Sequence, residues 1–241
     1  MSDAAPMAAL DARPTAIDHL VVIGHPSPTG FSHAIAHAYA EAVRANGQSV
    51  TEHDLYATGF DPLLRAHERP DAPDFALSDD VRREVALVEK ASAIVLVFPI
   101  WFGMPPAAIV GYVDRVLGAR LGSRALRHDE PYQMLAGKHL LLFTTSGATL
   151  PWLSAKGQWY GLKAAFDTYI ESIFSLAGCE HEHFDSIVTP LLPSYAAECL
   201  YHTGECARRI SATLLSEAHR RQVHAKLALP PAVDDPRYER S

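Results

Sequence analysis

Five short runs of residues along the chain are predicted to be β-strands, and the first is a nearly continuous apolar run of the kind that is buried on both faces of a sheet. These predicted strands are 17–24, 48–54, 93–98, 138–144 and 180–188. Segments with apolar residues spaced three or four positions apart follow the runs and predict amphipathic helices. These predicted helices are 31–46, 79–91, 105–118, 156–177 and 194–227.

Glycine, serine and proline mark where several of these elements begin and end. Gly47 and Gly178 stand at the expected C′ positions of helices 31–46 and 156–177. Ser78 precedes two acidic residues and is predicted to cap the next helix. The segment 55–77 holds three prolines and mixed charges, which indicates a long surface excursion.

Alternation of strands and helices predicts a single α/β domain, spanning 17–228, with a mostly parallel sheet and helices on both faces. Residues 1–16 are predicted to be a flexible N-terminal segment and 229–241 a C-terminal tail. In such a sheet, ligands bind outside the carboxyl ends of the strands. The loops after the first, third and fourth strands are therefore where a site is expected.

Composition excludes some classes of function. The chain has 241 residues, of which 48% are hydrophobic, and a formal net charge of −7. With no Lys/Arg-rich run, nothing indicates nucleic-acid binding. Three cysteines, Cys179, Cys199 and Cys206, form neither a CxxC pair nor a disulfide framework, as is typical of thiols in a reducing compartment.

Two further features argue for a cytoplasmic protein without a membrane span. The first sixteen residues lack the basic and apolar regions of a secretory signal. Segment 93–113 is uncharged and long enough to cross a bilayer, but Pro99, Pro105 and Pro106 would break a helix there.

The thirteen histidines raise the question of a metal site. His33 and His37 are spaced i,i+4 on a predicted helix, and His181 and His183 share one face of a predicted strand. Neither pair has a third ligand nearby in the sequence, so no metal is expected.

The loop after the first strand, 25–32, places the hydroxyls of Ser27, Thr29 and Ser32 at the N-terminus of a helix. Backbone N–H groups and the helix dipole favour an anion there, so the loop indicates a phosphate site. A simple Ser/Thr helix cap is the alternative, although it would need only one hydroxyl.

The other two loops are aromatic. Trp101 and Phe102 follow the third strand and are suited to stacking on a flat ligand, or to a dimer interface or a loop core. Segment 144–161, after the fourth strand, is rich in hydroxyls and glycine and carries Trp152, Trp159 and Tyr160. Together the three loops predict a phosphate-bearing, flat, aromatic ligand.

Several of these motifs occur together in one known family. They are His25-Pro26 with Thr29 and Phe31, then Pro99-Ile100-Trp101-Phe102-Gly103 leading through Pro106 to Gly111 and Asp114-Arg115, then Thr144-Thr145-Ser146-Gly147. From 17 to 188 the chain resembles the NAD(P)H quinone reductase family. The resemblance implies a flavodoxin-like three-layer sandwich with a five-stranded parallel sheet of order 2-1-3-4-5, and a homodimer with flavin at the subunit boundary.

The resemblance also implies roles for individual residues. The phosphate side of the flavin matches His25, Thr29, Phe31 and Ser32, and Ser27 belongs to the same hydroxyl-rich loop. The isoalloxazine ring and the dimer partner match Pro99, Ile100, Trp101 and Phe102. The pyrimidine end of the ring matches Thr145, Ser146 and Gly147.

The chain departs from the family at several positions. The family usually has Ser where Gly30 stands, Asn where Ser32 stands and Gly where Ser146 stands. Its catalytic Tyr and His correspond approximately to Trp152 and Trp159, and an indole cannot exchange a proton at neutral pH. Tyr160 is the candidate replacement donor, so these three residues are the catalytic candidates.

The function implied is a flavin-dependent NAD(P)H oxidoreductase that passes hydride to a quinone or similar small aromatic acceptor by a ping-pong mechanism. The hydroxyl-rich loop also resembles the phosphate loop of flavodoxins, so FMN and FAD both remain open, as do NADH and NADPH. Two alternatives are a nucleotide- or flavin-binding regulatory subunit of an ion-efflux system and a one-electron flavodoxin-type carrier. The mild negative charge disfavours the carrier.

Overall fold

The computed structural model describes residues 16–122 and 134–228. The predicted N-terminal segment, apart from residue 16, and the predicted tail lie outside the described residues. Within the described ranges, no helix has the length and apolar character needed to cross a membrane.

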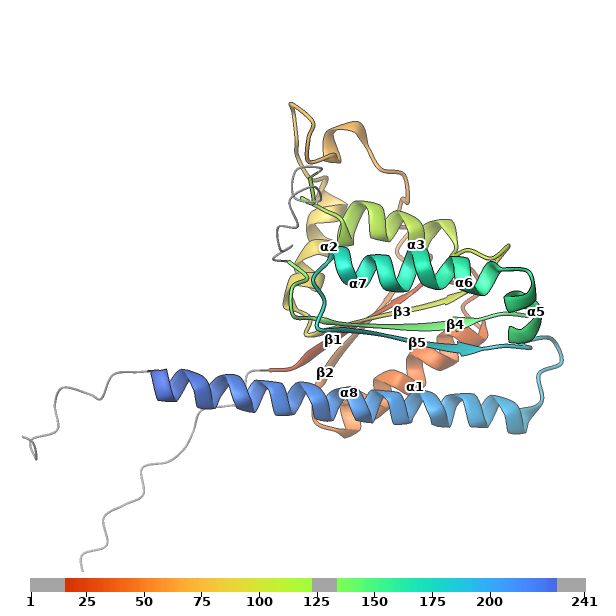
Figure 1. Ribbon diagram of the computed structural model, residues 1–241. Helices are drawn as coiled ribbons and strands as arrows, with labels where there is room; N and C mark the ends of the chain where they lie inside the picture. The colour runs from red at the N-terminus through yellow and green to blue at the C-terminus, as the bar shows by residue number, and fades with distance from the viewer. Residues whose placement is uncertain (1–15, 123–133, 229–241) are drawn as a thin grey trace, which may run out of the picture.

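Five parallel strands form one sheet of order β2-β1-β3-β4-β5, as the resemblance implied (Figure 1). The strands are β1 (Asp18–Ile23), β2 (Ser49–Asp54), β3 (Ala93–Pro99), β4 (His139–Thr145) and β5 (Gly178–Phe184). Every residue of the central strand β3 is buried, which agrees with its uninterrupted apolar run. Because the strands are parallel, their carboxyl ends lie along one edge of the sheet, where the three predicted loops begin.

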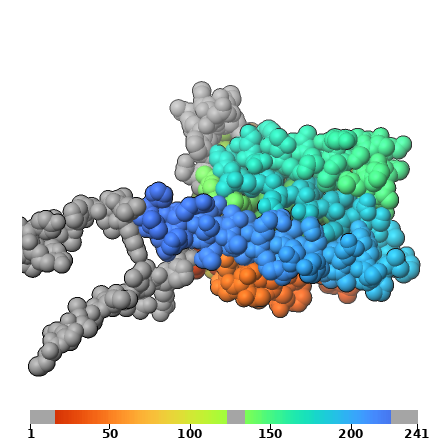
Figure 2. Space-filling view, turned by 60° about the horizontal axis from the view of Figure 1, so that its bottom comes forward, coloured from red at the N-terminus to blue at the C-terminus, as the bar shows by residue number. Residues whose placement is uncertain are grey.

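Helices cover both faces of the sheet, which gives three layers (Figure 1). One face carries α1 (Phe31–Ala45) and α8 (Pro193–Ala228), which lie side by side (Figure 2). The other face carries α2 (Asp79–Lys90), α3 (Ala107–Tyr112), α6 (Gln158–Leu162) and α7 (Tyr169–Ile173). The π-helical turns η2 (Val113–Leu117) and η3 (Lys163–Thr168) continue α3 and α6, and α5 (Leu150–Ala155) follows β4.

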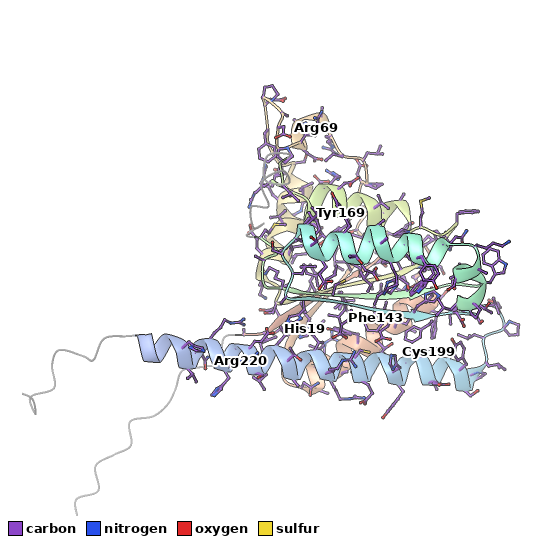
Figure 3. The ribbon with its side chains drawn as sticks, viewed as in Figure 1. His19, Arg69, Phe143, Tyr169, Cys199 and Arg220 are labelled. Carbon is purple, nitrogen blue, oxygen red and sulfur yellow. The ribbon has the colours of Figure 1, made fainter. Side chains whose placement is uncertain are left out.

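Each face of the sheet has its own hydrophobic core, because neighbouring strand residues point to opposite faces. Leu140 and Leu142 pack towards α2 and α3, whereas Leu141 and Phe143 pack towards α1 and α8. Figure 3 shows Phe143 and Cys199 between the sheet and α8. All three cysteines are unpaired, as predicted.

Two predicted elements have different bounds in the structure. The predicted helix 156–177 is interrupted at Gly157, whose φ of 74° ends α5 and begins α6, and Gly178 starts β5 instead of capping a helix. The predicted strand 180–188 ends at Phe184, because the ladder with β4 ends at the Thr145–Phe184 pair.

Ser78 was wrongly predicted to cap α2 with its side chain. It occupies the N-cap position, but its hydroxyl makes no capping hydrogen bond. The hydroxyl instead lies 3.2 Å from Nε2 of His67, within the excursion 55–77. That excursion is therefore tied to the body of the protein, and its short 3₁₀ turn η1 (Ala66–Glu68) carries a buried glutamate.

Candidate functional site

A cavity of about 150 Å³ opens at the carboxyl edge of the sheet, between the loops that follow β1, β3 and β4. Nine of the twelve residues predicted to bind a cofactor line it: His25, Phe31, Ser32, Pro99, Ile100, Trp101, Thr145, Ser146 and Gly147. Ile187, which sequence reasoning did not single out, completes the lining. Ser27, Thr29 and Phe102 are not among the lining residues.

The loop after β1 is folded around His25. The backbone N–H of Ser27 donates to Nδ1 of His25 at 3.0 Å, and the His25 ring lies 6.1 Å from the ring of Trp101. A Cβ on Gly30 would come within 2.4 Å of the His25 ring. The family's usual serine would therefore not fit at position 30 with His25 in this place.

Ser32 places a buried hydroxyl at one end of the cavity. Its side chain lines the cavity, the residue is 1% exposed, and its Oγ has no hydrogen-bond partner among the described residues. Ser32 lies in the first turn of α1, and the N-cap residue Gly30 has no side chain to cap the backbone N–H groups. A buried hydroxyl without a partner is costly, so this end of the cavity fits an anion such as a phosphate.

The hydroxyls of Ser27 and Thr29 lie 3.2 Å apart on the exposed outer part of the same loop. They bond to each other outside the cavity. Of the three predicted phosphate hydroxyls, the structure therefore brings only that of Ser32 into the cavity.

The loop after β3 is a tight hairpin. Trp101 and Met104 exchange two backbone hydrogen bonds of 3.0 Å, while Phe102 and Gly103 adopt φ angles of 54° and 78°. This left-handed conformation suits Gly103 but is unusual for phenylalanine. Phe102 is 95% exposed in this conformation. Its ring is therefore free to contact a ligand or a partner protein.

The loop after β4 joins the cavity through backbone and hydroxyl contacts. The N–H of Ile100 donates to the carbonyl of Thr145 at 2.7 Å, which ties the second loop to the third. The Ser146 hydroxyl lies 2.7 Å from the Ala148 carbonyl and 3.0 Å from Nε2 of His183. The family's glycine at this position would lack that hydroxyl.

Sequence reasoning missed a polar chain that runs from Ser146 under the cavity. His183 and His181 were noted only as a pair on one strand face. The structure places the Thr144 hydroxyl between their rings, at 2.7 and 2.8 Å, and Asp167 against His181. The shared face of the two histidines was visible in the sequence, but the pairing of β4 with β5 and the position of η3 were not.

The three predicted catalytic residues do not line the cavity. Trp152, on α5, and Tyr160, on α6, are exposed. Trp159 is half-buried, and its ring lies 4.9 Å from the rings of both His181 and His183. Of the three candidates, the structure thus places only Trp159 beside titratable groups, the two imidazoles.

Three of the four histidines considered as metal ligands have other partners. Nε2 of His33 bonds to Asp54 at 2.9 Å, and His181 and His183 bond to Thr144. In the described ranges, Glu182, His202 and Cys206 place ligand atoms within 4.8 Å of one another. However, an Arg209 guanidinium nitrogen lies 3.6 Å from the Cys206 sulfur, and burial raises the pKa of that thiol to about 11. A cation and a protonated thiol both oppose metal binding at this group.

Comparison with known proteins agrees with the fold. The chain is 29% identical over 171 residues to an uncharacterized NAD(P)H oxidoreductase of Haemophilus influenzae, a match that covers 70% of this chain and 82% of that protein. It is 34% identical over 149 residues to NAD(P)H dehydrogenase [quinone] 1 of Rattus norvegicus, where the match covers 54% of this chain and 53% of the rat protein. The chain thus spans about half the length of the rat enzyme.

Among solved structures, an FMN-dependent NADH-azoreductase from Bacillus anthracis in complex with FMN superposes with a TM-score of 0.59. The alignment covers 81% of this chain and 99% of that one at 16% identity, so it supports the fold alone. The profile of the family described as flavodoxin-like fold matches residues 18–185. With the strand order of the sheet, this match establishes that the chain belongs to the flavodoxin-like fold family.

Proposed function

We propose that this protein is a flavin-dependent NAD(P)H oxidoreductase that reduces a quinone or similar small aromatic acceptor. The observation that carries the proposal is the convergence of three polar and aromatic loops on one cavity, in which the buried Ser32 hydroxyl has no partner among the described residues. The relatives named as NAD(P)H oxidoreductase and NAD(P)H dehydrogenase [quinone], and the FMN in the azoreductase structure, support it.

The residues of the cavity fit a flavin in three parts. Ser32 and the first turn of α1 would hold the phosphate. Trp101, with the hairpin backbone, offers an aromatic surface for the ring system. The backbone of Ser146 and Gly147 would face the polar pyrimidine end. Both FMN and FAD carry these three parts.

When bound, the flavin supplies a centre that accepts hydride from a nicotinamide and later gives it to the acceptor. One cavity serving both partners in turn requires a ping-pong order, with NAD(P)⁺ leaving before the acceptor enters. The protein's part is to bind, orient and exclude water.

A second copy of the chain would complete the site. Cavities that enclose a ligand of this size are typically about 300–1,000 Å³, whereas this one is about 150 Å³. Large hydrophobic side chains are exposed on the loops that form it and on the segments that follow these loops: Trp101, Phe102, Met104, Trp152, Tyr160 and Val188. We therefore include a homodimer, with this surface at the subunit boundary, in the proposal.

The test is a titration of purified protein with FMN and with FAD, followed by an assay of NADPH or NADH oxidation with a quinone. We expect a yellow complex, quinone-dependent oxidation, and a dimer by light scattering. Trp101→Ala should weaken flavin binding, whereas Tyr201→Ala, at an exposed aromatic on α8, should not. Failure to bind either flavin would refute the proposal, and binding without NAD(P)H oxidation would favour a regulatory or carrier function.

A further inference from the structure

Five side chains form an unbroken line of hydrogen bonds from beneath α6 and η3 to the cavity. Nδ1 of His181 lies 3.0 and 2.9 Å from the two carboxylate oxygens of Asp167, and Nε2 of His181 lies 2.7 Å from Oγ1 of Thr144. The same Oγ1 lies 2.8 Å from Nδ1 of His183, and Nε2 of His183 lies 3.0 Å from Oγ of Ser146. Only Ser146 of the five lines the cavity.

The donor and acceptor properties of these five side chains restrict where the protons along this line of hydrogen bonds can be. The Asp167 carboxylate only accepts, so Nδ1 of His181 must carry a proton. The Thr144 hydroxyl has one proton to donate and two imidazole nitrogens to satisfy. It must therefore donate to one histidine and accept from the other, which leaves two self-consistent arrangements.

In the first arrangement, Thr144 donates to His183. His181 then donates from both ring nitrogens and is an imidazolium beside Asp167. His183 carries its proton on Nε2 and donates to Ser146, whose own proton goes to the Ala148 carbonyl at 2.7 Å. Every donor and acceptor in the chain is then satisfied.

In the second arrangement the three bonds among Ser146, His183, Thr144 and His181 are reversed, while Nδ1 of His181 still donates to Asp167. Ser146 donates to Nε2 of His183, Nδ1 of His183 donates to Thr144, and Thr144 donates to His181, which is neutral. The Ala148 carbonyl keeps a hydrogen bond from the backbone N–H of Ser186 at 3.3 Å. The two arrangements differ by one proton, added at Ser146 and held at His181.

We propose that Ser146, His183, Thr144 and His181 form a one-proton reservoir that is filled and emptied through the cavity. This inference rests on the proposed function, because it supplies the proton which that reaction consumes. A quinone that gains a hydride ion, with its two electrons, needs one proton to become a neutral hydroquinone. The reservoir gives that proton from the Ser146 hydroxyl as His181 becomes neutral.

Every atom is accounted for in one release of a proton to the acceptor (discharge) and one uptake of a proton afterwards (refill). On discharge, the Ser146 O–H bond breaks, and protons shift from His183 Nε2 to Ser146, from Thr144 to His183 Nδ1, and from His181 Nε2 to Thr144. After the product leaves, a hydronium ion from solvent that enters the cavity transfers one proton to Ser146 and becomes water, and each shift runs backwards. The reservoir thus acts when a bound acceptor excludes water from the cavity.

The geometry favours His181 as the place where the proton is held, because both of its ring nitrogens have an oxygen within hydrogen-bond distance, one of them on a carboxylate. Burial opposes the charge of Asp167, but the hydrogen bonds from His181 and Lys163 outweigh it and lower the pKa of this carboxyl. Burial, together with the charge of His181, lowers the pKa of His183 to about 4, against the attraction of Asp185. His183 therefore passes the proton on without keeping it.

Three neighbouring side chains limit the access of water to the two imidazoles and the number of charges around them. The Trp159 ring covers both imidazoles. Burial, with the negative charge of Asp167, raises the pKa of the nearby Cys179 thiol to about 12, so the thiol does not compete for charge at neutral pH. Lys163 Nζ lies 2.9 Å from Asp167 and stabilises its carboxylate.

The test uses the full-length protein without flavin, labelled with ¹⁵N, and nitrogen NMR of the histidine rings across a pH titration. We expect His183 to change from the Nε2–H to the Nδ1–H tautomer in the same step in which His181 loses its proton. A purely structural hydrogen-bond chain would leave the His183 tautomer unchanged. That result, or a His181 that is neutral throughout the range in which the protein is folded, would overturn the proposal.

Two variants of Thr144 distinguish the role of its hydroxyl from the role of its side chain in packing. Thr144→Val should abolish the coupled change of tautomer, and Thr144→Ser, which keeps the hydroxyl, should restore it. With flavin bound, Thr144→Val should slow quinone reduction by about 100-fold, as loss of general acid catalysis does, and shift its pH profile without changing the KM for NAD(P)H. His202→Gln is the control, because it removes a histidine–carboxylate pair with Glu182 that does not belong to this line of hydrogen bonds. It should change neither the His183 tautomer nor the rate of quinone reduction.

Failure of this proposal is distinct from failure of the proposed function. If the protein binds no flavin but the tautomers change together, the reservoir stands and the redox function falls. If flavin binds and NAD(P)H is oxidised but His183 keeps one tautomer, the function stands and the reservoir falls.

Discussion

Arg115 donates two hydrogen bonds to the carboxylate of Glu68, from Nε at 2.9 Å and from a terminal nitrogen at 2.6 Å. Both side chains are almost completely buried. The pair joins η2, on the face of the sheet, to the excursion 55–77. It therefore holds in place a segment that the sequence pattern marked only as a surface loop.

Removing one partner of this pair should destabilise the protein strongly. Glu68→Gln leaves the buried Arg115 charge with a neutral amide and with the partly exposed Asp80 carboxylate, 3.0 Å from a terminal nitrogen. We expect a loss of about 3 kcal/mol in the free energy of unfolding. Chemical denaturation measures it. Glu89→Gln, which breaks the exposed Arg120 pair at 3.0 Å, is the control and should cost less than about 1 kcal/mol. Equal losses in the two variants would contradict the structure.

The same pair should affect stability in acid. Burial opposes the charge of Glu68, but the hydrogen bonds from Arg115 outweigh it and lower the pKa from 4.5 to about 2. This lowered pKa means that the stabilisation is complete above about pH 4.5 and is lost as the pH falls towards 2. Denaturation of Glu68→Gln should accordingly depend less on pH than wild type between pH 4.5 and 2. Parallel curves would contradict this expectation.

His183 should affect stability in a different pH range. Burial lowers its folded pKa to about 4, below the usual value of 6.5 for histidine, so the unfolded protein binds the proton more readily. Its contribution is therefore complete above about pH 6.5 and is lost as the pH falls through 4, at up to about 1.4 kcal/mol per pH unit. His183→Asn should remove this slope. A wild type and variant with identical slopes between pH 6.5 and 4 would show that His183 titrates normally.

Gly111 should not accept a side chain. A Cβ there would lie 2.3 Å from the backbone carbonyl oxygen of Pro62, which cannot rotate away. We expect Gly111→Ala to lower the free energy of unfolding by about 1–3 kcal/mol. Gly161→Ala is the control, because nothing lies within 4 Å of its Cβ position in α6, and it should raise stability by about 0.5–1 kcal/mol. A neutral Gly111→Ala would mean that the excursion does not pack on α3.

Ser32 should matter for the ligand more than for the fold. Ser32→Ala removes a buried hydroxyl without a partner, so the stability of the flavin-free protein should not fall. Loss of a hydrogen bond to a charged phosphate should weaken flavin binding about 10- to 100-fold. Ser211, on α8, has a similarly unpaired buried hydroxyl, and Ser211→Ala should leave flavin affinity unchanged. Equal affinities for Ser32→Ala and wild type would exclude the phosphate role.

Sequence patterns were enough to predict the five strands, the two long helices α1 and α8 and the three loops at one edge. These features can be predicted because they depend on the local pattern of apolar residues. The uninterrupted apolar run of β3, for example, is itself enough to indicate a strand buried on both faces. Element ends depended on contacts absent from the pattern. Gly157 ends a helix because it adopts a positive φ, and Ser186, two residues after the end of β5, also has a positive φ, of 56°.

The residues of the candidate site were harder to predict than the secondary structure. The nine lining residues lie in motifs that match the family directly, in loops whose composition was itself unusual. The Trp152, Trp159 and Tyr160 candidates came from approximate correspondence with the family and do not line the cavity. His181 and His183 were noticed but left without partners.

By itself, then, the sequence determined which segments are buried and that polar and aromatic loops follow three strands of a parallel sheet. Only the tertiary structure decided that the Thr144 hydroxyl lies between two imidazoles and that the Glu68 carboxylate lies against Arg115. Burial depends on the side chain's own apolar surface, which a sequence shows directly. A hydrogen bond depends on a few tenths of an ångström between atoms on different elements, which only strand register and helix position determine.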